Sequence, residues 1–236
     1  MNGNTLNTNT LDTNTLIESL ALRAEPVPRL LAPWRRTALW LALSLLYVGG
    51  VAALHLAAAP LPGPIGFRLV VEQAAILATA VTAAIAAFSS VVPGRDRRLA
   101  LIPLVPLAIW LAALGQGCLS DWQAAGAAGV APRPDPDCVP AAIAFGILPT
   151  IVMLVLLRRG APLVPAVSMA LGALAVGAIV NLGLRMFHVG DLSIQILVWH
   201  LLMAVVLSIV TSRLGRYLLG WPAFMARAGN RYAATP

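Results

Sequence analysis

Six long apolar runs, separated by short polar or arginine-bearing segments, dominate the chain. They extend over Thr37–Leu56, Val70–Val92, Leu99–Leu119, Pro140–Leu157, Leu163–Leu184 and Leu192–Ser212. A helix rises 1.5 Å per residue, so the third run would be about 31 Å long, and the hydrocarbon core of a bilayer is about 30 Å thick. The pattern predicts an all-α membrane protein with six transmembrane helices, and Pro149 predicts a kink in the fourth.

The residues before the first run follow a different pattern. They open with a T-N-T-L repeat (Thr8–Leu11, Thr13–Leu16), which is typical of a disordered leader. A short helix is expected to begin near Thr13 or Thr15 and to carry Leu16, Ile17 and Leu20 on one face. Indole and guanidinium side chains are favourable near lipid headgroups, and they mark the approach to the membrane at Arg29, Trp34, Arg35 and Arg36.

Composition supports a membrane protein and gives no sign of an enzyme. Hydrophobic residues make up 59% of the 236 residues and charged residues 11%, and the mean hydropathy is +0.85, values too apolar for a soluble domain. The sequence contains no CxxC, GxSxG or HExxH motif and no phosphate-binding loop. We therefore expect neither enzymatic activity nor a cofactor.

Arginine placement predicts which side each loop faces. The net charge of +7 arises from sixteen basic residues, all of them arginine, and such residues favour the cytoplasmic side. If the N-terminus is cytoplasmic, thirteen arginines lie inside and only Arg68, Arg133 and Arg185 lie outside. This predicts cytoplasmic N- and C-termini, with a cytoplasmic leader and N-terminal segment over residues 1–36, a membrane bundle over 37–213 and a cytoplasmic tail over 214–236. The charge excess is explained by orientation, so we expect no direct nucleic-acid partner.

Two cysteines are predicted to share the outer face. Cys118 ends the third run and Cys138 precedes the fourth. A disulfide closing this loop of about twenty residues would contribute roughly 3 kcal/mol, so one interpretation is a structural staple. The other is a redox or soft-metal sensor, because thiolates bind soft cations and exposed disulfides are labile.

Other titratable residues extend the possible chemistry of this face. His188 and Asp191 lie in the outer loop between the fifth and sixth runs, and with Asp121 they could complete a metal site beside the cysteines. His200 lies within the sixth run, where it is either functional or a neutral partner of Asn181 or Gln195. Glu72 is either a pathway carboxylate or, as we prefer, an interfacial residue.

The order of several motifs resembles one known family. LIESLA and EPVPRLLAPWRR precede the first run, AFSSVVPGRDRRLAL follows the second, LGQGCLSDW ends the third, LLRRGAPLVPA follows the fourth, and Trp199-His200 lies in the sixth. In this order they resemble the NrsF-type negative regulators of sigma factors, which are six-helix anti-sigma factors of the bacterial inner membrane. The resemblance covers nearly all of the chain after the leader.

The resemblance implies a function and assigns different roles to the N-terminal segment and to the two cysteines. A cytoplasmic segment, here about Leu16 to Arg36, would hold an extracytoplasmic-function sigma factor away from RNA polymerase. Cys118 and Cys138 would take part in the response to a signal such as a soft metal ion or oxidative stress. A membrane thiol oxidoreductase and a small-solute transporter are the alternatives; the first requires a second redox pair or a quinone, the second polar residues converging at mid-membrane.

Overall fold

The structure is a computed structural model that describes residues 13–23, 30–58, 66–92, 94–126, 138–160 and 164–187, together with residues 209, 210 and 213. Every regular element within these ranges is a helix, so the predicted all-α class is confirmed. The chain divides into two compact units, Met1–Leu30 and Leu31–Pro236. In the first unit the helix α1 (Thr13–Arg23) begins at one of the two predicted positions.

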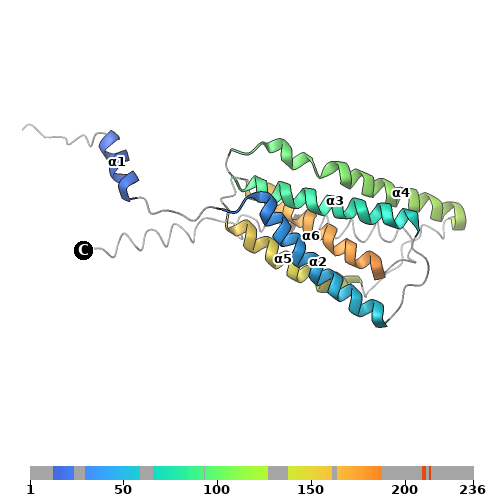
Figure 1. Ribbon diagram of the computed structural model, residues 1–236. Helices are drawn as coiled ribbons and strands as arrows, with labels where there is room; N and C mark the ends of the chain where they lie inside the picture. The colour runs from blue at the N-terminus through green and yellow to red at the C-terminus, as the bar shows by residue number, and fades with distance from the viewer. Residues whose placement is uncertain are drawn as a thin grey trace, which may run out of the picture. The chain divides into compact units, whose positions relative to one another are not determined.

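Five long helices lie among the described residues of the second unit (Figure 1). They are α2 (Pro33–Ala58), α3 (Phe67–Ser90), α4 (Leu104–Ala125), α5 (Cys138–Arg158) and α6 (Pro165–Phe187). All five are long and apolar enough to cross a membrane. The predicted sixth span over Leu192–Ser212 lies outside the described residues except for 209 and 210, so the count of six stays a prediction.

The sequence predicted that the third apolar run is one helix beginning at Leu99. The structure differs at the start of this run. A short 3₁₀-helix, η1 (Arg97–Leu101), comes first, and α4 begins after Pro103. The carboxylate of Asp96 accepts a hydrogen bond of 2.9 Å from the backbone N–H of Arg98 and so caps η1. Proline has no backbone N–H to continue a helical ladder. The tight turn and the proline together place the α-helix several residues later than hydropathy alone indicates.

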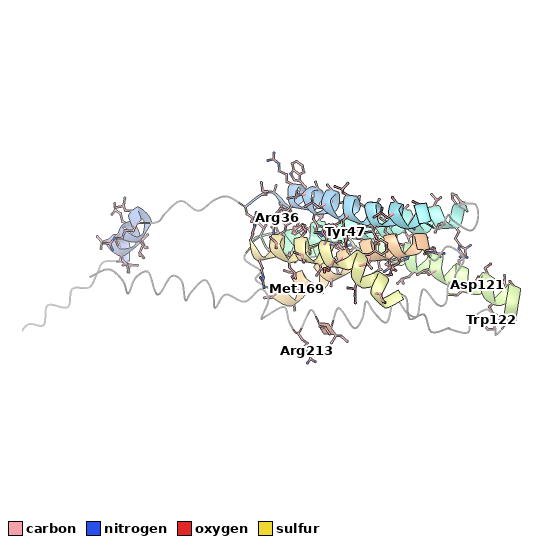
Figure 2. The ribbon with its side chains drawn as sticks, turned by 90° about the horizontal axis from the view of Figure 1, so that it is seen from below. Arg36, Tyr47, Asp121, Trp122, Met169 and Arg213 are labelled. Atoms are coloured by element: carbon pink, nitrogen blue, oxygen red, sulfur yellow. The ribbon has the colours of Figure 1, made fainter. Side chains whose placement is uncertain are left out.

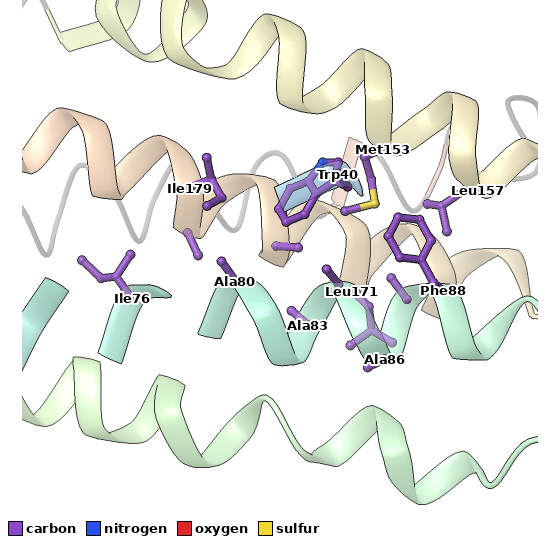
Figure 3. Close-up of a cluster of buried hydrophobic side chains, with 14 of the residues drawn as sticks. Trp40, Ile76, Ala80, Ala83, Ala86, Phe88, Met153, Leu157, Leu171 and Ile179 are labelled. Atoms are coloured by element: carbon purple, nitrogen blue, oxygen red, sulfur yellow. The ribbon is translucent and has the colours of Figure 1, made fainter. Parts of the chain in front are cut away.

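α3 is the central helix of the bundle, because it packs against α6, α4, α2 and η1 (Figure 1). Its buried face is largely alanine, and small side chains let helix backbones approach closely in a membrane. Larger side chains fill the space at one end of this face. Figure 3 shows Phe88 of α3 beside Leu157 and Met153 of α5, with Trp40 of α2 next to Met153.

α3 and α6 run in opposite directions, as contacts at their two ends show. The hydroxyl groups of Ser90, at the end of α3, and Ser168, near the start of α6, lie 2.8 Å apart. Glu72, near the start of α3, pairs with Arg185, near the end of α6. The helix ends therefore form two opposite faces of the bundle, as an up-and-down membrane topology requires.

α5 is one helix that continues through Pro149, and α2 binds its backbone. Trp40 Nε1 donates a hydrogen bond of 3.0 Å to the carbonyl oxygen of Pro149, and the Tyr47 hydroxyl donates one of 2.6 Å to the carbonyl oxygen of Ala144. Both donors come from α2. The kink expected at Pro149 stays a prediction.

Candidate functional site

The described part of the predicted sigma-binding segment exposes its apolar residues. Leu16, Ile17 and Leu20 are 44%, 59% and 61% exposed, and α1 has no buried residue. Before α2 continues into the bundle, Trp34 is exposed and the Arg35 guanidinium lies 5.1 Å from the centre of its ring. Arg29, which was also predicted to belong to this segment, lies outside the described residues.

Arg36 differs from its two neighbours because its side chain is buried within the bundle. It is 1% exposed, its guanidinium lies 4.7 Å from the centre of the Phe88 ring, and its Nη2 donates a hydrogen bond to the carbonyl oxygen of Leu156. Leu156 is among the last four residues of α5, whose carbonyl groups lack helical partners. Arg36 therefore caps the C-terminal end of α5 and satisfies the partial negative charge there.

The opposite face of the bundle carries the described cysteine. Cys118 is a half-buried free thiol in the last turns of α4, and Asp121 follows it one turn later. Asp121 and Arg68, from the start of α3, lie close enough to interact electrostatically with this thiol. Figure 2 shows Asp121 and Trp122 at the end of α4, far along the bundle from Arg36. The two predicted functional regions of the bundle therefore lie on its opposite faces.

The pairing of the cysteines and the metal site stay predictions. Cys138 is the first residue of α5, but its side chain lies outside the description, as do His188, Asp191 and His200. Among the residues that the structure does describe, no group of three His, Cys, Asp or Glu side chains gathers as a metal ion would require. Asn181, a proposed partner of His200, donates to the carbonyl oxygen of Gly177 at 2.9 Å.

A buried ion pair is the polar feature that the sequence did not reveal. Arg185 Nε lies 3.1 Å from Glu72 Oε1, and the two side chains are only 5% and 1% exposed. Glu72 is therefore buried between α3 and α6, and its interfacial position in the membrane stays a prediction. Arg185, which directly follows the fifth apolar run, belongs to α6. The available signal was a charged residue near the start of the second apolar run, Glu72, and another directly after the end of the fifth, Arg185. Nothing in the sequence, however, pairs residues 113 positions apart.

These observations first define a class of protein. An all-helical bundle with five membrane-length apolar helices among its described residues, and with a separate N-terminal helix, is a polytopic α-helical membrane protein. Charged side chains inside it are paired or bonded to backbone, as a membrane environment requires.

The family then follows from comparison with known proteins. The chain belongs to the NrsF family, described as negative regulator of sigma F, whose sequence model matches residues 20–221. No curated protein and no solved structure matches the chain. Regulators of this anti-sigma type are not normally enzymes.

Proposed function

We propose that this chain is an anti-sigma factor of the bacterial inner membrane. Its cytoplasmic N-terminal segment holds an extracytoplasmic-function sigma factor away from RNA polymerase. The observation that carries the proposal is α1, a helix without a buried residue, in a chain whose family negatively regulates a sigma factor. An isolated helix of eleven residues is marginal in water, so a partner that covers its apolar face would also stabilise it.

The apolar face of α1 is the proposed contact surface. Leu16, Ile17 and Leu20 lie within about 100° of one another around the helix axis at 3.6 residues per turn, and Leu22 lies on the opposite side. An amphipathic helix of this kind binds by laying such a face into an apolar groove of its partner. The neighbouring exposed Trp34 and Arg35 extend the same segment toward the membrane.

The proposed partner can be tested by co-purification. The full-length chain in detergent is expected to retain a sigma factor, and the chain without residues 1–36 is expected to lose it. Leu20→Asp should weaken binding at least about fivefold, because a desolvated contact of this size is worth more than about 1 kcal/mol. Leu22→Asp is the matched control, since Leu22 is even more exposed, at 82%, but faces away. Equal binding by both variants would contradict the proposed surface.

We further propose that the outer cysteines provide the signal input. Cys118 near Asp121 and Arg68 and Cys138 at the start of α5 would respond to a soft metal ion or an oxidant. The support is the position of Cys118 in α4, one turn before Asp121, which lies at the opposite end of the bundle from Arg36 (Figure 2). Serine substitution at Cys118 and Cys138 should abolish induction of the sigma regulon by metal or oxidant while repression persists. Unchanged induction would exclude the sensor role.

A further inference from the structure

α2 and α5 are joined by three side chains of α2 that donate to backbone carbonyl groups of α5. Besides Arg36 to Leu156, these are Trp40 to Pro149 at 3.0 Å and Tyr47 to Ala144 at 2.6 Å. We call these three bonds the α2–α5 seam. The donors lie at positions i, i+4 and i+11, which fall on one face of a helix. Their eleven-residue span corresponds to about 16 Å of helix, so the seam extends over about half of a membrane.

Lipid offers no competing hydrogen-bond partner to the three donors of the seam. Arg36 and Trp40 are 1% and 0% exposed, so neither donor can exchange its acceptor for water. Pro149 lacks a backbone N–H and so removes one internal bond of α5. α5 is therefore bonded to α2 at a position where the backbone hydrogen-bond pattern of α5 is interrupted.

The two ends of the seam lie at the two regions that the proposed function requires to communicate. α5 begins at Cys138, and α2 begins at Pro33, so the last residues of the N-terminal segment (Leu16–Arg36) form the first turn of α2. α5 contacts α2 directly, whereas α4, which carries Cys118, packs principally on α3. A shift of α5 along or about its axis moves the acceptors of all three seam bonds together.

We infer that the α2–α5 seam transmits a change at the Cys138 end of α5 to the start of α2 and hence to the N-terminal segment. Trp40 and Tyr47 are positioning residues in this inference, which rests on the proposed function. Because the proposed signal releases the partner, the change at Cys138 and the bound partner must favour different arrangements of α2 and α5. Each then disfavours the other to the same extent.

The chain offers a matched set of variants for the test. Trp40→Phe and Tyr47→Phe each remove the donor and keep an aromatic ring. Trp110→Phe is the control, because Trp110 is also buried but its Nε1 has no hydrogen-bond partner among the described residues. The same chemical change is therefore made once within the seam and once in α4.

The experiment uses the full chain with Cys118→Ser, in which Cys138 is the single cysteine. A maleimide–polyethylene glycol reagent attached to Cys138 provides the perturbation, and the readout is the Kd for the purified sigma factor that the full-length chain retains in the co-purification. Modification is expected to change this Kd at least about fivefold, the lower end of typical coupling. In the Trp40→Phe/Tyr47→Phe double variant the Kd of the unmodified protein should stay within about twofold, and modification should no longer change it. Trp110→Phe should keep the full effect.

Two results would overturn the inference. One is a double variant that responds to modification as strongly as the parent, and the other is a parent whose Kd does not respond at all. If the double variant loses its helical circular dichroism signal, Tyr47→Phe alone, which removes only an exposed hydrogen bond, must still reduce the response. If the unmodified parent and the chain without residues 1–36 both fail to bind the sigma factor, this result would instead contradict the proposed function.

Discussion

Removing the charge of Glu72 is expected to be among the most destabilising conservative changes in this protein. Glu72→Gln keeps the size of the side chain but withdraws the carboxylate that lies 3.1 Å from Arg185 Nε. Two unit charges about 4 Å apart interact by about 4 kcal/mol at an effective dielectric constant of about 20, and breaking a buried pair costs about 3–5 kcal/mol. The glutamine oxygen can still accept a hydrogen bond worth about 1 kcal/mol, so the expected loss is about 2–4 kcal/mol.

The free energy of unfolding can be measured by titrating the purified chain from mild detergent micelles into sodium dodecyl sulfate and following helical circular dichroism. Glu18→Gln, on the exposed surface of α1, is the control and should change stability by less than about 0.5 kcal/mol. The double variant Glu72→Gln/Arg185→Gln should lose less than the sum of the single variants, since neither unpaired charge remains. A loss below about 0.5 kcal/mol for Glu72→Gln, or strict additivity, would refute a stabilising ion pair.

Two further predictions concern packing of α6. Gly183→Ala should destabilise the bundle by about 1–3 kcal/mol, because the new Cβ would lie 2.7 Å from Phe145 Cδ1 and 2.9 Å from a Val48 methyl carbon. Gly177→Ala is the control, because nothing lies within 4 Å of its Cβ. It should change the free energy of unfolding in the same assay by less than about 1 kcal/mol. Ser168→Ala should cost about 1 kcal/mol through loss of the 2.8 Å contact with the α3 serine, and a stability equal to wild type would show that this contact contributes nothing.

Hydropathy and turn residues were sufficient to predict the helices of this protein. A bilayer forces each spanning segment to satisfy its own backbone bonds, so a long apolar run has essentially one structure available to it. The five described spans follow from this rule. The helix α1 does not, and it was predicted instead from a capping signal and from Leu16, Ile17 and Leu20 on one face. The start of α4 was predicted less well. It depends on capping by Asp96 and on the position of Pro103, and hydropathy averaged over many residues does not detect either.

Sequence alone therefore determined the membrane class, the apolar spans and the residues of α1 available to a partner, because these depend on local composition and on the properties of lipid. The tertiary structure decided which polar side chains meet. Arg36 looks like its exposed neighbour Arg35 until α5 is placed beside it, and Glu72 and Arg185 are an ion pair only once α3 and α6 are antiparallel. Pairing of this kind depends on helix order and rotation, which arise from contacts between residues far apart in the chain.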